Sequence, residues 1–307
     1  MFSLPRRFLV GGAAALSASF VLAAQAPVTR FAPGLIPSTA VANAAPAFTP
    51  DGRTVYFFST PVGGECCTLM VSRQAQGHWS APKVASFSGH YRDLEAAFSP
   101  SGKFLVFASN RPDQPGGALM DGRYNGQDHP GSGGHLWRIA RRGAGWASPE
   151  LLPASINANQ SVFSPAVTAD GSLYFMRADD GIHFHIFRSQ FAHGHYQTPV
   201  LADFSKTPYG DFDPAVAPDE SYLIFSSGRP PAPKTSDLFI IFRTGGGWSE
   251  PLDLRNAISP DVHGVEARLS PDGNTLYFEH PTDAAHPSAG SAIFRVRVQA
   301  VFAAHGQ

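Results

Sequence analysis

Short apolar runs separated by turn residues recur along the chain. The stretch "PAFTPDGRTVYFFST", from Pro46, has a run of small residues, an Asp-Gly turn and a second run rich in aromatic and β-branched residues, the pattern of a β-hairpin. Four further copies follow at intervals of 50, 69, 49 and 53 residues: "AAFSPSGKFLVFASN" from Ala96, "PAVTADGSLYFMRAD" from Pro165, "PAVAPDESYLIFSSG" from Pro214 and "ARLSPDGNTLYFEHP" from Ala267. Self-similarity at this spacing indicates a repeat architecture.

Each hairpin is followed by a third apolar run, such as "TLMVSRQ" at Thr68 and "DLFIIFR" at Asp237. Four copies then place an aromatic residue three positions before a proline, as in Trp79 with Pro82, which suits an outermost edge strand. The fifth copy lacks this unit, but "VTRFAPGLIP" near the N-terminus supplies one. We therefore predict an all-β fold, a five-bladed β-propeller of four-stranded antiparallel blades whose ring is closed by the N-terminal strand, with a six-bladed ring as the alternative.

The repeats resemble a known family. The "SPDG…LYF" hairpin, the "DLF" third strand, the "W-x-x-P" unit and the endings "SNRP" and "SSGRP" are similar to TolB-like, WD40-like β-propeller repeats of exported bacterial proteins. The resemblance covers essentially the whole chain after the N-terminal segment. It implies a propeller used as a binding platform without chemistry of its own, and it identifies no partner.

The N-terminus and the overall charge restrict location and partners. Arg6 and Arg7 precede an apolar segment that is short for a membrane span and ends in small residues, so we expect residues 1–26 to be an export signal, possibly of the twin-arginine type. Residues 27–307 are then a single propeller domain, periplasmic or secreted, with no transmembrane segment and with a long loop at 112–134. The formal charge of −1 gives no reason to expect nucleic acid as a partner.

The two cysteines, Cys66 and Cys67, are adjacent and cannot hold distant parts of the fold together. They can stay reduced, form a vicinal disulfide or link two chains.

His183 and His185 would share a strand face, but the sequence shows no third metal ligand near them, so we predict no metal site and no cofactor.

Alignment of the copies places carboxylates near the centre of the predicted ring. The position directly before the first strand reads Ala45, Glu95, Ser164, Asp213 and Glu266; two residues earlier it reads Asn43, Asp93, Val162, Asp211 and Gly264. One residue into the strand, the channel column reads Ala47, Ala97, Ala166, Ala215 and Arg268. We expect the candidate ligand-binding residues to be Asp93, Glu95, Asp211, Asp213, Glu266 and Arg268.

Two functions fit this pattern. The leading interpretation is a non-catalytic binding or scaffold protein for a protein or envelope ligand, because the repeats are regular and carry few polar outliers. The alternative is a glycan-processing hydrolase that uses the carboxylates of the central funnel. The sequence contains no G-x-S-x-G, Walker or H-E-x-x-H motif, so the hydrolase, metal and nucleotide chemistries tied to those motifs have no support.

Overall fold

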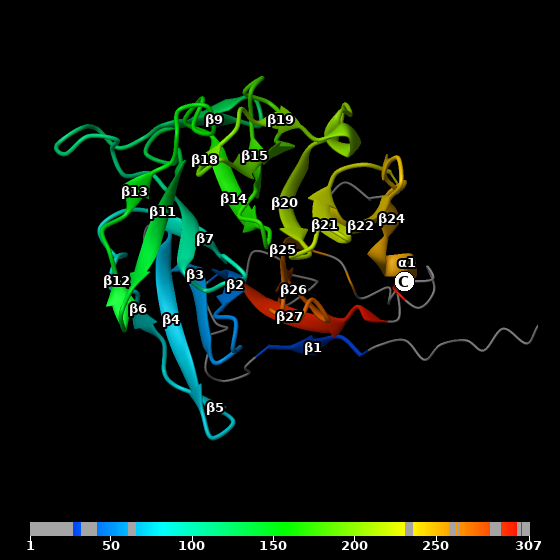
Figure 1. The fold of residues 1–307 in the computed structure, drawn as a ribbon, viewed down its shortest axis with the longest axis horizontal. Coiled ribbons are helices and arrows are strands. Elements are labelled where there is room, and N and C mark those ends of the chain that lie inside the picture. Colours follow the sequence, from blue (N-terminus) through cyan, green and yellow to red (C-terminus); the bar gives the residue numbers. More distant parts are fainter. Residues whose placement is uncertain are drawn as a thin grey trace, which may run out of the picture.

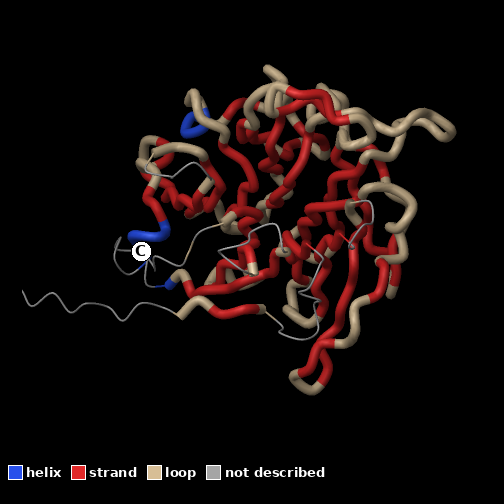
Figure 2. The backbone as a smooth tube through the Cα atoms, turned by 180° about the vertical axis from the view of Figure 1, so that it is seen from behind, coloured by secondary structure: helices blue, strands red, loops and turns tan. Residues whose placement is uncertain are grey.

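The computed structural model describes residues 27–31, 42–60, 66–230, 236–257, 262, 264–282, 290–299 and 302. These residues form an all-β ring (Figure 1), and Figure 2 shows from behind that helix is confined to small pieces. The pieces include α1 (Leu254–Ala257) and a 3₁₀ turn at Asp203–Ser205, and Gln299 and Phe302 near the C-terminus are also helical.

Five antiparallel sheets radiate from the centre, each with its first strand innermost. From the inside outward, the first two are β2 (Ala42–Phe48), β3 (Thr54–Thr60), β4 (Thr68–Ala75) and β6 (Lys83–Val84), then β7 (Asp93–Phe98), β8 (Phe104–Ser109), β11 (His135–Arg142) and β13 (Glu150–Leu151). The third and fourth are β14 (Val162–Val167), β15 (Leu173–Arg177), β16 (His185–Ser189) and β19 (Val200–Leu201), then β20 (Asp211–Val216), β21 (Tyr222–Ser227), β22 (Asp237–Thr244) and β24 (Leu252–Asp253). The fifth is β25 (Val265–Leu269), β26 (Thr275–Pro281), β27 (Ser291–Arg297) and β1 (Thr29–Arg30).

The N-terminal strand closes the ring. β1 pairs antiparallel with β27, Thr29 opposite Arg295 and Arg30 opposite Phe294, and the two strands lie side by side in Figure 1. The predicted five-bladed propeller is confirmed, and the six-bladed alternative is wrong. The predicted aromatic positions lie just before the outermost strands, in short ribbons that extend the third strand: β5 (His78–Trp79), β12 (Gly145–Trp146), β17 with β18 (Phe191–Ala192, His195–Tyr196) and β23 (Gly247–Trp248).

Every inner strand carries a β-bulge at the same place. The register shifts between Ala44 and Ala47 in β2, and the equivalent shift occurs in β7, β14, β20 and β25. The residue in the bulge is left-handed in all five blades, with φ of 50° at Ala45, 52° at Glu95, 47° at Ser164, 52° at Asp213 and 59° at Glu266. A bulge re-aims its side chain and frees its N–H from the ladder. The inner strands therefore begin earlier than we predicted, and the aligned column lies within them.

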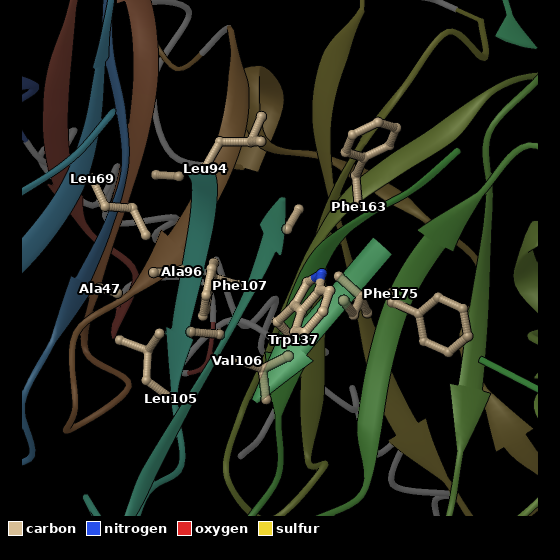
Figure 3. Packing of buried hydrophobic residues seen from close by; sticks show 14 of the residues in the cluster. Ala47, Leu69, Leu94, Ala96, Leu105, Val106, Phe107, Trp137, Phe163 and Phe175 are labelled. Atoms are coloured by element: carbon tan, nitrogen blue, oxygen red, sulfur yellow. The ribbon is translucent and has the colours of Figure 1, made fainter. Parts of the chain in front are cut away.

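Apolar faces of neighbouring blades pack against each other around the ring. Figure 3 shows the contact between the first two blades and its continuation, with Leu69, Leu94, Leu105 and Phe107 among the buried side chains. Leu69, Leu105 and Phe107 have no exposed surface. Burial of about 25 cal/mol per Å² of apolar surface makes these contacts the main stabilising term.

The long loop at 112–134 folds onto the third blade. It contains the hairpin β9 (Gly122–Tyr124) and β10 (Gln127–His129), in which the rings of Tyr124 and His129 stack 3.8 Å apart. Backbone hydrogen bonds join the tip of this hairpin to the loop between β15 and β16.

The predicted export signal, residues 1–26, lies outside the described residues. Within the described part, no helix is long and apolar enough to cross a membrane.

Ring closure depends on the anchoring of β1 by Phe31. This side chain is 4% exposed and its ring lies 5.1 to 5.7 Å from those of Phe48, Trp79 and Tyr277. We expect Phe31→Ala to lower the free energy of unfolding by about 3–5 kcal/mol, because it removes a buried aromatic side chain at the closure. Urea unfolding followed by tryptophan fluorescence measures the effect. Phe191→Ala, at a partly exposed aromatic, is the control; an equal loss in both variants would contradict a special role for the closure.

Candidate active site

Three carboxyl groups from three blades meet at the centre of the ring. Glu95 of β7, Asp213 of β20 and Glu266 of β25 each offer an oxygen atom, and these atoms lie within 4.8 Å of one another. The side chains occupy the bulge position of their strands, and the residues are only 4%, 3% and 9% exposed. We call these residues the carboxyl trio.

The trio also binds the backbone of neighbouring blades. Glu95 Oε2 accepts a hydrogen bond of 2.6 Å from the N–H of Ser164, and Asp213 Oδ2 accepts one of 2.9 Å from the N–H of Glu266. Both donors are the left-handed bulge residues of the next blade. Ser226 Oγ donates a further bond of 3.3 Å to Asp213. The bulges thus leave backbone N–H groups without a ladder partner, and the carboxyl groups accept their hydrogen bonds. One such bond joins the second blade to the third, and the other joins the fourth blade to the fifth.

Arg268 is the cation at this centre. Its Nη2 lies 3.5 Å from Glu266 Oε2 and donates to Ser164 Oγ at 3.1 Å, while Nη1 donates to the carbonyl of Ala267 at 2.7 Å. Its Nε is buried without a hydrogen-bond partner among the described residues. One guanidinium therefore faces three carboxyl groups. Because a single positive charge cannot balance three negative ones, ionising all three carboxyl groups together costs free energy.

Burial is the main reason that these carboxyl groups hold protons. It raises the pKa of Glu95 to about 7, an effect that the nearby Asp213 carboxylate increases and Arg268 opposes. Burial likewise raises the pKa of Asp213, and it raises that of Glu266 well above its usual range, with Asp213 and Glu95 adding to the shift. The trio can therefore hold protons near neutral pH, as a group that donates or accepts protons in catalysis must.

Asp93 and Asp211, the two other predicted site carboxylates, do not join the trio. Asp93 is bound by Arg111 at 2.6 Å, and Asp211 is bound by Arg229 at 2.7 Å. In both blades the arginine Nε also donates to a serine hydroxyl two residues earlier, at 2.9 Å. These arginines belong to the "SNRP" and "SSGRP" endings, so the endings brace the second strand against the first within one blade.

Two cavities lie near the inner strands, and the trio lines neither of them. One, of about 320 Å³, opens on the side of the hairpin turns; its wall contains the predicted channel column of Ala47, Ala97, Ala166, Ala215 and Arg268. The other, of about 540 Å³, lies where the inner strands begin, between Cys66, Cys67 and Thr68 of the first blade, the segment Gly89 to Arg92 and the long loop. The structure joins Cys66 and Cys67 in a disulfide at this wall. Arg92 is close enough to Glu95 to favour its ionised form.

Sequence reasoning missed two residues at this centre. Ser226 and Glu279 occupy the same position of the second strand, opposite the residue that precedes the bulge. Ser226 binds Asp213, and the charge of Glu279 contributes to the raised pKa of Glu266. The sequence did contain a signal for them. At this position two copies have a polar residue, whereas the other three have Phe58, Ala108 and Met176.

The fold is shared with known enzymes. No family model matches the sequence, and no curated protein matches it. Among solved structures, the chain is similar to a thermostable family-43 glycoside hydrolase, with 13% identity, 86% of this chain and 91% of that chain covered, and a TM-score of 0.55. It is also similar to an α-L-arabinofuranosidase from Lactobacillus brevis, with 12% identity, 82% and 90% covered, and a TM-score of 0.51. At this identity the likeness establishes the five-bladed propeller fold.

These comparisons correct our leading functional interpretation. We expected a non-catalytic binding or scaffold protein, and the similar propellers are glycoside hydrolases instead. The physical reason for the error is that the polar residues at the centre are separated by about 50 residues or more in the sequence, so the repeats looked regular.

The raised pKa of Glu95 makes stability fall as the pH rises. Between about pH 4.5, the usual glutamate value, and about pH 7, Glu95 is protonated in the native state and ionised in the unfolded chain. Unfolding therefore releases a proton in this range. One such proton corresponds to a loss of about 1.4 kcal/mol per pH unit in this window. We expect urea unfolding at pH 5, 6 and 7 to show this decline and Glu95→Gln to reduce its slope. The exposed-site variant Glu150→Gln is the control, and an unchanged slope in Glu95→Gln would refute the assignment.

Proposed function

We propose that this protein is a glycan-processing hydrolase whose proton-transfer groups are the carboxyl trio. The observation that supports it is the convergence of Glu95, Asp213 and Glu266 from three blades, at a site where burial raises their pKa values. Hydrolysis of a glycosidic bond requires a protonated carboxyl group to donate to the leaving oxygen and an ionised one to act as base or nucleophile. The two solved structures of similar fold named above are a glycoside hydrolase and an arabinofuranosidase.

The hydrogen bonds suggest a division of roles within the trio. Asp213 accepts bonds from the Glu266 N–H and from Ser226, and bonds of this kind favour the ionised form. We therefore assign Asp213 as the base or nucleophile. Glu95 accepts a single backbone bond and has a pKa near neutrality, so it is the candidate general acid. Glu266 binds Arg268, and the charges of Asp213 and Glu95 add to the burial that raises its pKa.

The 540 Å³ cavity is the proposed approach for the sugar. It contains the exposed ring of Tyr91 together with His90 and Arg92, a combination of aromatic surface and polar groups suited to a sugar ring and its hydroxyls. Arg111 covers one face of the Tyr91 ring at 5.2 Å and holds it in place. Arg92 donates to the carbonyl of Ser132 in the long loop at 3.1 Å, so the loop fixes an arginine whose charge acts on Glu95.

The location of the substrate follows from the N-terminal segment. Residues 1–26 carry the features of an export signal, so we propose a periplasmic or secreted enzyme acting on a glycan of the envelope or the surroundings. The repeats resemble TolB-like, WD40-like propellers of exported bacterial proteins, which agrees with this proposed location. That the chain is related to those propellers stays a prediction.

The proposal is tested with a panel of nitrophenyl glycosides, arabinofuranosides included, and with arabinose- and xylose-containing oligosaccharides. We expect Asp213→Asn and Glu95→Gln each to lower kcat by at least about 100-fold, because general acid and base groups contribute on the order of 10² to 10⁴. Glu95→Gln should also remove the basic limb of the pH profile, which reports the acid near pH 7.

A matched control separates catalysis from a structural role. Glu150→Gln alters an exposed carboxylate and should leave kcat and stability unchanged. If the wild-type protein hydrolyses none of these substrates, or if the trio variants change the free energy of unfolding while any glycosidase activity persists at the wild-type rate, the trio is an ion-pair network that stabilises the ring and the proposal fails.

A further inference from the structure

A second polar cluster lies on the third blade, away from the trio. One imidazole nitrogen of His183, one of His185 and a carboxylate oxygen of Asp180 all lie within 4.8 Å of one another. His185 begins β16, and the other two belong to the loop that leads into it. The sequence indicated the histidine pair but no third ligand, because Asp180 lies in a loop whose path the repeats do not predict.

The carboxylate of Asp180 is oriented by its own loop. Its Oδ1 accepts hydrogen bonds of 2.8 Å from the N–H groups of both Ile182 and His183. Its Oδ2 lies 3.3 Å from Nδ1 of His183. The backbone thus holds one oxygen while the other faces the imidazole, the arrangement of an oriented ligand with a supporting hydrogen bond.

His185 is half-buried, and one of its ring nitrogens is unsatisfied. Nδ1 of His185 is inaccessible to solvent and has no hydrogen-bond partner among the described residues. A buried polar atom without a partner costs on the order of 1–3 kcal/mol. The side chains of Asp180 and His183 are 47% and 43% exposed, so an ion can reach the cluster from solvent.

The long loop clamps this site. The N–H of Asn125 donates to the carbonyl of Ile182 at 2.9 Å, and the N–H of Gly126 donates to that of Gly181 at 3.0 Å. Phe184 stands between the two histidines in the sequence, and its ring lies 5.3 Å from the ring of Tyr124. The loop carrying the cluster is therefore held on both sides, by β15 and β16 and by the β9–β10 hairpin, which limits the entropy lost on binding an ion.

We propose that Asp180, His183 and His185 form a binding site for a divalent transition-metal ion, with Zn²⁺ as the best fit. Two imidazoles and one carboxylate are a ligand set that Zn²⁺ accepts, and the exposed side leaves a coordination position for water. Nδ1 of His183 and Oδ2 of Asp180 already lie 3.3 Å apart, a separation that two ligands of one tetrahedral Zn²⁺ ion can adopt.

The ion would act on the face of the ring where the inner strands begin. Arg177, the last residue of β15, pairs with Val162, the first residue of β14, so the loop that follows Arg177 lies at that end of the blade. The long loop also forms one wall of the 540 Å³ cavity. Metal binding would stiffen the loop pair beside that cavity.

The test uses tag-free protein treated with EDTA, desalted, and kept without reductant so that the Cys66–Cys67 disulfide stays closed. Zn²⁺ is titrated by calorimetry and Co²⁺ by visible absorption. We expect one ion per chain, bound with a Co²⁺ spectrum of low coordination number. His183→Ala, His185→Ala and Asp180→Asn should each weaken binding at least about tenfold, which corresponds to about 1.4 kcal/mol.

The chain offers a matched control in His193 and His195. This pair has the same spacing: His193 lies in the turn between β17 and β18, and His195 begins β18. No candidate metal cluster of the described residues contains either histidine. The double variant His193→Ala/His195→Ala should bind Zn²⁺ as the wild type does. Absence of binding to the wild type, wild-type affinity in the Asp180 and His183 variants, or loss of binding in the control pair would each overturn the assignment. Circular dichroism confirms that each variant is folded.

Discussion

The left-handed bulge in each inner strand determines what lies at the centre of this propeller. Without it, the side chains at Ala45, Glu95, Ser164, Asp213 and Glu266 would follow the alternation of their strands. The bulge instead turns the column toward the axis and frees one N–H per blade. A left-handed residue with a side chain is uncommon and costs energy, so its repetition in five blades means that the ring requires it. The freed N–H groups then need acceptors, and carboxylates of the preceding blades meet two of them.

A charge imbalance follows from this geometry. Three carboxyl groups surround one guanidinium in a region from which water is largely excluded, and the energy of ionising a third or even a second group is high. The centre resolves this by retaining protons, not by recruiting further cations, and Asp93 and Asp211 show the contrast. Each of those has an arginine of its own within 3 Å. Two kinds of buried carboxylate therefore coexist: those held by an arginine of their own, and the trio, whose pKa values are raised by burial.

The sequence predicted the fold better than the site. Copies of one hairpin at near-regular spacing, each with its Asp-Gly or Ser-Gly turn or a variant of it, were sufficient to predict five blades and closure by the N-terminal segment "VTRFAPGLIP". Alignment also placed Glu95, Asp213, Glu266 and Arg268 in related positions. It could not show that Asp93 and Asp211 are engaged within their own blades, because that depends on side-chain direction at the bulge. One clue was present: the two copies with Asp at this position are the two that end in "SNRP" and "SSGRP". Asp180 was out of reach, since an irregular loop carries it.

The repeat itself indicates which polar residues the fold does not require. At the bulge position, Ala45 and Ser164 adopt the same left-handed conformation as the three carboxyl residues, with no exposed surface. Alanine therefore fits this backbone conformation, although it cannot supply the acceptor that Glu95 and Asp213 each give to an N–H of the next blade. In the channel column alanine serves in four blades of five. The carboxyl groups cost desolvation that alanine would avoid, and Arg268 is needed only where they are present. A ring selected for stability alone would have little reason to keep four ionisable side chains at its centre. Their presence is better explained by proton chemistry or ligand recognition than by packing, which is the physical basis for placing function at this centre.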